Sequence, residues 1–386
     1  MKEKLIALVF ISTCGLHTNA MAARQFVHPG ATINHAELSI TQQYISENKE
    51  PWASQFKQLL QIATPYQKKQ APKDGMESDQ KDDARKAYAN VLAWYYTGNE
   101  EYAQNAIEIF NVWSDSFEGY KLPPEHSGNQ SQLNAAWIGA LLAPAAEILR
   151  GYSGWKKSDQ QKLKLFFQQK FYPILNQISF FNGNNDLTQI DAIMSMAVFC
   201  DDETEFNLGI DRLRARSPAY LYLASDPAES RIYGGSDNSK WFNPQQWPDG
   251  LTQESCRDLG HHAQYGLASA LHAAEVAHNQ GVDIYGEQQV RYIAAMELMA
   301  KELLKGSNRF SEICGTQAKG YGNSNKDDFF NTWEIGYNHY YHRKQIEMPF
   351  TKQLIATKIR AQSQSDWNIF FETLTHGKDF SINSKK

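Results

Sequence analysis

Hydrophobic positions along this chain recur about every three to four residues, the spacing at which side chains share one face of an α-helix. Alanine, leucine, glutamine and glutamate, which favour helices, are frequent in these periodic segments, and alternating β-branched residues are nearly absent. The pattern predicts helices over residues 82–97, 100–117, 132–150, 158–178, 186–200, 204–216, 258–280, 286–305 and 328–342. The expected fold class is therefore all-α.

Residues typical of helix ends support several of these boundaries. Ser158, Asp159 and Asp202 stand where helices should start, and Gly98 and Gly281 stand where helices should end. Helices of this length joined by Gly-, Asn- and Pro-containing loops favour antiparallel pairs in an incomplete (α/α) toroid or barrel, which leaves a cleft at one end. No strict repeat is present, which argues against a solenoid of short repeats.

The long segment over residues 217–252 lacks helical periodicity and is rich in proline and glycine. Its aromatic residues are Tyr220, Tyr222, Tyr233, Trp241, Phe242 and Trp247. Loops of this length are usually functional or disordered, so we expect an aromatic-rich lid or cleft wall. The alternative is a surface excursion that packs on the toroid.

The first 22 residues have a basic start, a short apolar run and a small-residue cleavage pattern, as a secretory signal peptide has. Cys14 lacks the leucine that usually begins a lipoprotein box, so a cleaved signal is favoured over lipidation. Later apolar runs fall short of the roughly 20 residues that a membrane span needs. No linker divides the remaining chain, so we expect a periplasmic or secreted protein with one toroid domain over residues 23–386.

Charge and cysteine content narrow the function classes. The formal net charge is -5 and no basic tract is present, which argues against a nucleic-acid partner. Cys200, Cys256 and Cys314 remain after cleavage, and this odd number permits at most one internal disulfide. Neither a metal site nor a cofactor motif is evident, and we expect a monomer, which could still bind an acidic polymer if its cleft is locally basic.

The densest group of chemically active residues is the run Arg257-Asp-Leu-Gly-His-His-Ala-Gln-Tyr265. In a continuous helix Arg257, His261 and Tyr265 would share a broad face, with His262 one residue round from it. Arginine suits recognition of a carboxylate, and histidine and tyrosine are common general acids and bases. The alternative is a helix start whose polar groups are satisfied locally, with Arg257 paired to a neighbouring carboxylate.

This run, continued by Gln280-Gly-Val-Asp-Ile-Tyr285, resembles the alginate lyase superfamily of polysaccharide lyases. Three further motifs agree with that family in order, namely Gln132-Leu-Asn-Ala-Ala-Trp137, Asn182-Gly-Asn-Asn-Asp186 and Trp333-Glu-Ile-Gly-Tyr-Asn-His-Tyr340. The resemblance spans roughly residues 85–345. It implies an (α/α) toroid that cleaves a uronate polysaccharide by elimination.

The resemblance also implies roles for individual residues. Asn184 matches the family's carboxylate-neutralising asparagine and Arg257 its arginine, while His261 or His262 matches the motif histidine and Tyr265 a tyrosine of the same helix. Two departures are that Asn185 stands where many relatives have tryptophan, and that the histidine is doubled. Candidate substrate contacts, with Tyr337 and Tyr340 also as reserve proton carriers, are Tyr95, Gln132, Asn134, Trp137, Trp241, Tyr337, Asn338, His339 and Tyr340.

The chemistry of uronates explains this set. The proton at C5 becomes acidic once the neighbouring C6 carboxylate is neutralised, which amide and guanidinium donors can do. We therefore expect a lyase that cleaves a 4-linked polyuronate by β-elimination, with mannuronate-rich alginate favoured and glucuronan next. The alternatives are a glycoside hydrolase with a carboxylate pair drawn from Asp249, Glu254 and Asp258, and a glycan-binding protein without catalysis.

Overall fold

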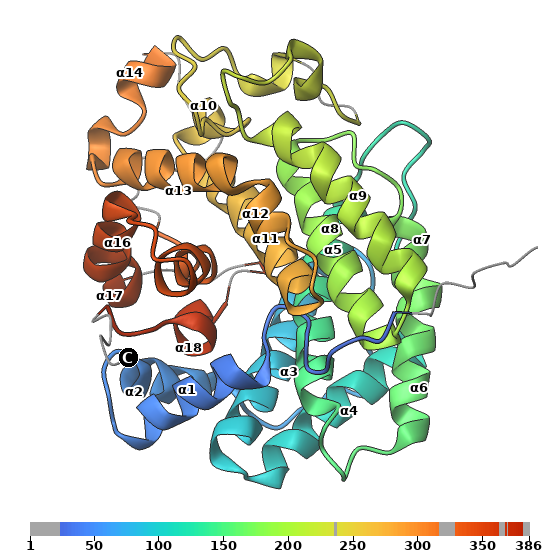
Figure 1. Cartoon of the computed structure of the whole chain (residues 1–386). Coiled ribbons are helices and arrows are strands. Elements are labelled where there is room, and N and C mark those ends of the chain that lie inside the picture. Colours follow the sequence, from blue (N-terminus) through green and yellow to red (C-terminus); the bar gives the residue numbers. More distant parts are fainter. Residues whose placement is uncertain (1–23, 235–237, 316–328, 363–366, 369, 381–386) are drawn as a thin grey trace, which may run out of the picture.

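The computed structural model describes residues 24–234, 238–315, 329–362, 367–368 and 370–380, and the expected signal peptide lies outside them. The described residues form a ring of helices (Figure 1). In chain order these are α1 (His35–Ser46), α2 (Trp52–Ile62), α3 (Glu77–Thr97), α4 (Glu100–Ser116), α5 (Gln130–Leu149), α6 (Lys157–Phe166), α7 (Tyr172–Leu175), α8 (Gly183–Cys200), α9 (Glu203–Tyr220), α10 (Ser255–Asp258), α11 (His261–Asn279), α12 (Ile284–Glu287), α13 (Gln289–Leu303), α14 (Ser311–Cys314), α15 (Glu334–Tyr337), α16 (Pro349–Leu354), α17 (Arg360–Gln362) and α18 (Glu372–His376). π-Helical turns, Phe167–Phe171, Asn338–Arg343 and Ile355–Ile359, continue three of them.

The helices are arranged as inner and outer partners. The inner helix α8 packs against α5 and α11, and α5 packs in turn against α3. Every residue of α8 is buried, whereas its outer partner α9 keeps one side in solvent. This arrangement is an (α/α) toroid, as the sequence pattern predicted, and its buried apolar residues form two large clusters.

Helix α5 is the one described helix that is long and apolar enough to cross a membrane. In the structure 94% of that apolar stretch is buried against neighbouring helices, as expected for the core helix of the ring.

Asp186, inside the fully buried helix α8, has two ionic partners. Asp186 accepts hydrogen bonds from Arg212 and from Arg216 Nε, the latter at 2.9 Å, and both arginines come from α9. Burial alone would raise the pKa of Asp186, but the two guanidinium groups hold this pKa below its usual value. The ion pairs thus join α8 to α9 close to the beginning of α8.

The helix predicted over residues 258–280 is interrupted. Leu259 and Gly260 have left-handed backbone conformations, with φ of 56° and 91°, and they separate α10 from α11. A Cβ atom at Gly260 would lie 2.9 Å from the Phe310 ring, so glycine is favoured by both the φ angle and the close packing. Arg257 therefore lies on a different helix from His261, and the continuous helical face predicted for the run does not form.

A buried histidine connects three helices of the ring. His272 on α11 contacts Asp191 Oδ2 of α8 at 3.2 Å through Nδ1, and Glu372 Oε1 of α18 at 2.7 Å through Nε2. Burial alone would lower the pKa of His272, but the hydrogen bonds and charges of the two carboxylates outweigh it and raise the pKa to about 10. His272 is therefore charged in the folded protein at neutral pH.

This charge is expected to make the fold less stable at alkaline pH. Because the folded-state pKa lies above the ordinary value of 6.5, the stabilisation is complete below about pH 6.5 and is lost as the pH rises through about 10. In that window the free energy of unfolding should fall by at most about 1.4 kcal/mol per pH unit. Thermal unfolding of the wild type and His272→Gln at a series of pH values checks this. The variant should be less stable than the wild type, and its stability should change less with pH above neutral. Parallel curves of stability against pH would contradict the raised pKa of His272.

Candidate active site

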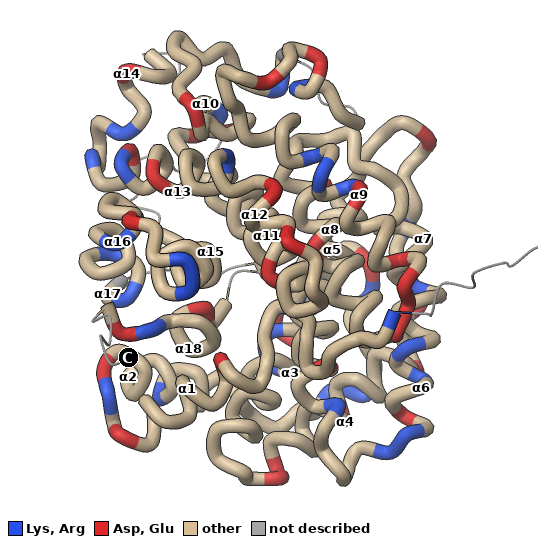
Figure 2. The backbone as a smooth tube through the Cα atoms, in the orientation of Figure 1, with Lys and Arg blue, Asp and Glu red and all other residues tan. Residues whose placement is uncertain are grey.

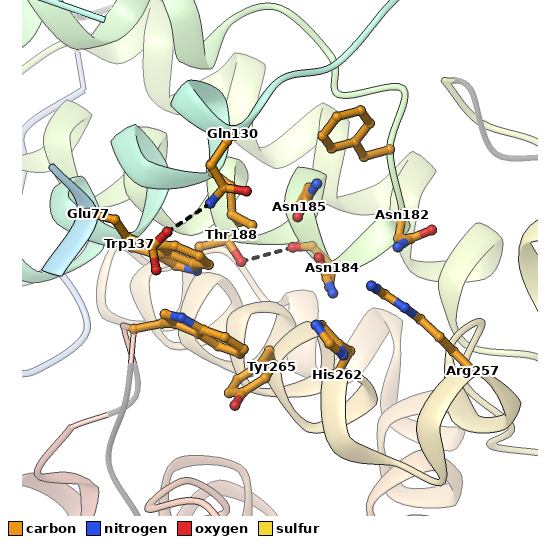
Figure 3. Close-up of a pocket in the computed structure, with 13 residues that line it drawn as sticks. Glu77, Gln130, Trp137, Asn182, Asn184, Asn185, Thr188, Arg257, His262 and Tyr265 are labelled. Carbon is orange, nitrogen blue, oxygen red and sulfur yellow. Dashed lines mark hydrogen bonds between the residues drawn. The ribbon is translucent and has the colours of Figure 1, made fainter. Parts of the chain in front are cut away.

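A cleft of about 370 Å³ lies where the N-terminal parts of α3, α5, α8 and α11 meet. Its lining residues are Glu77, Gln130, Leu133, Trp137, Phe181, Asn182, Asn184, Asn185, Thr188, Arg257, His262, Tyr265 and Trp367 (Figure 3). The positive ends of the helix dipoles face this end of the ring. The cleft is therefore suited to an anionic ligand although the whole chain is acidic.

Asn184 lies in the first turn of α8 and is held by two neighbouring side chains. Its backbone oxygen accepts from Thr188 Oγ1 at 2.8 Å, and its side-chain Nδ2 donates to Glu254 Oε1 at 3.1 Å. The residue is 5% exposed and lines the cleft. Asn184 thus presents an amide of fixed orientation to a ligand, rather than serving only as a helix cap.

Arg257 reaches the cleft from the short helix α10. Its Nη1 donates to Glu254 Oε1 at 2.6 Å, and its Nε lies 3.9 Å from Asp258 Oδ2. The pairing with a neighbouring carboxylate, given above as the structural alternative, is therefore present. It coexists with a place in the cleft, since the guanidinium group points toward Asn184 in Figure 3.

A disulfide fastens the helix that carries Arg257. Cys256 on α10 is bonded to Cys314 on α14, and Cys200 is a buried free thiol. This agrees with the limit of one internal disulfide set by the sequence. The bond ties the Arg257 turn to a segment that follows α13.

Replacing both Cys256 and Cys314 by serine is expected to lower the free energy of unfolding by about 4 kcal/mol, because the bond closes a long loop of the unfolded chain. The sequence separation is 58 residues. Denaturant unfolding with and without the substitutions measures the loss, and Cys200→Ser serves as a control that removes a thiol without removing a crosslink. Equal midpoints for the double variant and the wild type would contradict the expectation.

His262 is oriented by Asp258. The carboxylate of Asp258 accepts from the His262 backbone N at 3.0 Å and also contacts ring Nδ1. Nε2 is then the ring nitrogen available to a ligand, and the ring edge faces Asn184 in Figure 3. With Nδ1 protonated toward Asp258, a neutral His262 has an unprotonated Nε2 that can accept a proton.

His261 and Tyr265 occupy the neighbouring side of α11. Tyr265 lines the cleft with its ring, 3% exposed, and its ring centroid lies 3.7 Å from that of Trp367. Its hydroxyl is 3.4 Å from His261 Nε2 and points away from Asn184 in Figure 3. His261 packs against the Phe330 ring and is not among the lining residues. The doubled histidine is thus divided between the cleft and the helix packing.

One wall of the cleft is aromatic. Trp137 of α5 stacks on Trp367, with 5.1 Å between ring centroids and 4° between ring planes. Lys81 Nζ lies 5.6 Å from the Trp137 ring centroid and 5.9 Å from that of Trp367. Trp137 is therefore one of the residues that line the cleft, and a cation lies beside it.

Two predicted substrate contacts on α5 lie just behind the lining. Gln132 forms a capping box with Asn129 and donates through Nε2 to the Gln177 carbonyl at 2.9 Å. Asn134 Oδ1 accepts from Gln130 Nε2 at 3.0 Å. Gln132 and Asn134 are both buried, so they support the lining residue Gln130 and the start of α5 rather than face the cleft.

The other predicted contacts lie away from the cleft. Tyr95 is near the far end of α3, where its hydroxyl is 3.3 Å from His35 Nδ1. Asn338 donates to Glu37 Oε2 at 3.1 Å, and Tyr340 donates to the Tyr285 carbonyl at 3.0 Å.

Tyr337 and His339 are also core side chains. Tyr337 stacks on Tyr341 and His339 on Tyr285, with ring centroids 4.8 Å and 3.9 Å apart. Burial raises the pKa of Tyr337, and burial lowers the pKa of His339 to about 3. The structure therefore corrects the expected substrate contacts of the 337–340 motif and its role as a reserve for proton transfer.

The described part of the aromatic-rich segment 217–252 does not form the expected lid over the cleft. Helix α9 continues to Tyr220, and Asp226 forms an ion pair of 2.7 Å with Arg291 of α13. Trp241, 1% exposed, packs against Trp247 with 5.2 Å between ring centroids. None of the described residues of this segment lines the cleft, and the buried Trp241 ring has no face open to a sugar.

Several lining residues were not singled out from the sequence. Asn182 belongs to the same motif as Asn184, and Phe181 and Thr188 lie within two residues of that motif, so it was a signal for all three. Glu77 and Gln130 begin inner helices. Trp367 had no signal, because it is distant in the chain from every motif. Within the described ranges, His, Cys, Asp and Glu side chains form no cluster of three or more suited to a metal.

Known proteins similar to this chain share its fold. An alginate lyase from Bacteroides ovatus has 13% sequence identity and a TM-score of 0.58, with 91% of this chain and 99% of that chain covered. Alginate lyase A1-III from Sphingomonas species A1 has 11% identity and a TM-score of 0.56, with coverages of 91% and 96%. A histidine-to-alanine variant of alginate lyase A1-III complexed with a tetrasaccharide has 12% identity and a TM-score of 0.59, with the same coverages of 91% and 96%. No curated protein sequence matches the chain.

The family model described as Alginate lyase matches residues 35–310. The matched region extends from α1 to the residue before α14 and contains Asn184, Arg257 and His262, whereas Trp367 lies beyond it. Since the match covers more than half of the chain, this protein belongs to the alginate lyase family and is a polysaccharide lyase.

Proposed function

We propose that this lyase cleaves a 4-linked polyuronate by β-elimination in the cleft at the N-terminal ends of α5, α8 and α11. The observation that carries the proposal is that the Asn184 amide, the Arg257 guanidinium and the His262 imidazole converge there from three separate helices. The amide and the guanidinium group can donate hydrogen bonds to a carboxylate, and the imidazole can accept a proton beside it.

Neutralisation of the uronate carboxylate is assigned to Asn184 and Arg257. Both groups donate hydrogen bonds, and both are held in place before substrate arrives. Donors that are preorganised around a carboxylate stabilise the enolate-like anion that forms when C5 loses its proton. They act in a cleft whose helix dipoles already favour negative charge.

Proton transfer is assigned to His262, with Asp258 holding its ring. Nε2 takes the proton from C5, the electron pair forms the C4–C5 double bond, and the C4–O4 bond breaks. In mannuronate and glucuronate the C5 proton and O4 lie on the same side of the ring, so the protonated His262 can return the proton to O4. Tyr265, whose hydroxyl points toward His261, is assigned to packing of the ring wall.

The preferred substrate in this proposal is mannuronate-rich alginate, with glucuronan second. A single residue that both removes and returns the proton favours these two polymers over polyguluronate, which needs a base and an acid on opposite faces of the sugar ring. The described acidic and basic residues are interspersed along the helices (Figure 2), so affinity for a polyanion is attributed to the cleft and not to a basic surface. The solved structures most similar in fold include alginate lyases, one of them complexed with a tetrasaccharide.

A glycoside hydrolase would need two carboxylates across the cleft. Glu254 and Asp258 come from one helical region and are engaged with Arg257 and His262, while Asp249 accepts from the Ala224 backbone N at 2.7 Å. Among the described lining residues Glu77 is the one carboxylate. These contacts favour elimination over hydrolysis.

We also propose that the protein acts in the periplasm or outside the cell. The disulfide between Cys256 and Cys314 suits an oxidising compartment, and the first 22 residues have the pattern of a secretory signal. Sequencing the N-terminus of the protein recovered from its producing cell tests this. A mature chain that still begins at Met1 would contradict it.

Incubation with polymannuronate, polyguluronate and glucuronan, followed by the ultraviolet absorbance of unsaturated uronate, tests the reaction and the substrate. We expect the fastest rise on polymannuronate. Chain cleavage without the unsaturated product would indicate a hydrolase, and binding without cleavage would indicate a glycan-binding protein. A protein inactive on all three polymers would overturn the proposal.

A further inference from the structure

Glu254 lies directly behind the cleft and is completely buried, at 0% exposure. Its Oε1 accepts from Asn184 Nδ2 at 3.1 Å and from Arg257 Nη1 at 2.6 Å. Its Oε2 accepts from the Asn184 backbone N at 3.3 Å and from the Tyr220 hydroxyl at 3.0 Å. One carboxylate therefore contacts both residues to which neutralisation of the substrate is assigned.

The surroundings of Glu254 explain how a charge can be buried there. Arg257 supplies a positive charge, and the start of α8 supplies the positive end of a helix dipole. Four donors are what an ionised carboxylate, which only accepts hydrogen bonds, requires when it loses its water. Tyr220 is held for this contact between two glycines, because a Cβ atom at Gly183 or Gly266 would lie only 2.4 Å or 2.2 Å from it.

The acceptor-only carboxylate also fixes the orientation of the Asn184 amide. If the amide were turned over, Oδ1 would face Glu254 Oε1 and two acceptors would meet without a proton between them. With Nδ2 toward Glu254, one of its two N–H bonds is used and the second remains for a ligand. The same oxygen holds Arg257 by Nη1, and Asp258 lies 3.9 Å from Nε, so Nη2 is the nitrogen left for a ligand carboxylate.

We propose that Glu254 is a positioning residue for the elimination, which holds Asn184 and Arg257 in the orientation that neutralises the uronate carboxylate. The inference rests on the function proposed above. It adds that the reaction requires the negative charge of Glu254 although the substrate is itself negatively charged. The Glu254 carboxylate does not contact the substrate but orients the donors that do.

The variant Glu254→Gln tests the proposal with little change of shape. A glutamine amide offers one acceptor oxygen and two donor hydrogens, so it cannot accept from all four present donors. We expect kcat on the best substrate to fall by roughly 100-fold, with KM changed by less than about tenfold, since remote sugar contacts remain. An unchanged kcat in an active enzyme would overturn the positioning role while leaving the proposed function intact.

A matched control is Glu147→Gln, near the end of α5 that lies away from the cleft. Glu147 is also buried, at 1% exposure, and accepts from His28 Nδ1 at 2.9 Å and from the Gly30 backbone N at 3.2 Å. Its substitution should lower the melting temperature by a similar amount but leave kcat within about twofold of the wild type. If kcat falls equally in both variants, the loss reflects damage to the fold and the proposal fails.

A double-mutant cycle separates positioning from simple destabilisation. Because Glu254 acts partly through Asn184, adding Glu254→Gln to Asn184→Ala should lower kcat by clearly less than the roughly 100-fold expected in the wild type, whereas independent roles would multiply the two losses. A crystal structure of Glu254→Gln gives a readout that does not depend on turnover. An Asn184 amide and an Arg257 side chain that stay in place would contradict the proposal even if the enzyme were inactive on every polymer tested.

Discussion

Replacing His262 by alanine is expected to lower kcat on polymannuronate by roughly 10²–10⁴-fold, the usual contribution of a positioned general base. His262 is the described histidine that lines the cleft, and Asp258 holds its Nδ1 so that Nε2 is left for the substrate. Alanine removes the proton acceptor without disturbing Asn184 or Arg257. Oligouronate binding, measured by calorimetry, should therefore remain within about tenfold of the wild type.

The adjacent histidine supplies the control for this experiment. His261→Ala removes a ring of the same size that packs on Phe330 and is not part of the cleft lining, and it should lower kcat by less than about tenfold. The kcat of Asp258→Asn should lie between those of His261→Ala and His262→Ala, since this substitution leaves the His262 ring in place but weakens its orientation. If Tyr265→Phe abolished turnover while His262→Ala remained active, the proton would have to be assigned to the tyrosine.

The fold was predictable from the sequence because most of its helices are long and rich in helix-forming residues, and outer helices such as α4 and α6 have one apolar face. The inner helix α5 was recognisable by its nearly continuous apolar residues, whereas α8 also buries polar residues. Helices α1, α2, α14, α16, α17 and α18 lie outside the predicted ranges. Of these, α1, α16 and α18 are short or bury few apolar residues. In α1 the buried residues are Glu37, Leu38 and Thr41, of which only one is apolar, so hydrophobic periodicity cannot reveal the helix.

The candidate site was predicted in part, and the errors have physical causes. Asn184, Arg257, His262 and Tyr265 do line one cleft, but not on a shared helical face. The break at Gly260 puts Arg257 on a separate helix, and the packing of α8 against α11 adds Asn184. A left-handed glycine is readily accommodated between helices, and a pattern of side chains does not report backbone angles.

Two other features depend on tertiary contacts. Asn338 and Tyr340 of the 337–340 motif form hydrogen bonds inside the ring. Because the same residue types are common in binding sites, the sequence alone could not distinguish the two roles. Trp367 joins the cleft by stacking on Trp137 across more than half of the chain. The local sequence around either residue does not indicate such a contact, so an aromatic wall of this kind can be identified only from the tertiary structure.

Replacing Asn184 by aspartate is expected to have the second large effect, a fall in kcat/KM of at least roughly 1000-fold on the best substrate. The side chain keeps its size, but the donor Nδ2, which lies 3.1 Å from Glu254 Oε1, becomes an acceptor. A second carboxylate then faces the buried one, and it also repels the uronate that the site must neutralise. Because each tenfold loss corresponds to about 1.4 kcal/mol, the expected penalty exceeds about 4 kcal/mol in transition-state stabilisation.

The neighbouring residue makes the test specific to position. Asn185→Asp puts the same charge in the same turn of α8, at a lining residue that is also 5% exposed. Since repulsion of the polymer is common to both variants, Asn185→Asp should raise KM but keep kcat within about tenfold of the wild type. The difference between the two variants then measures the amide held by Glu254. Equal losses of kcat in both would mean that the charge of the cleft as a whole, rather than the oriented amide of Asn184, controls the elimination.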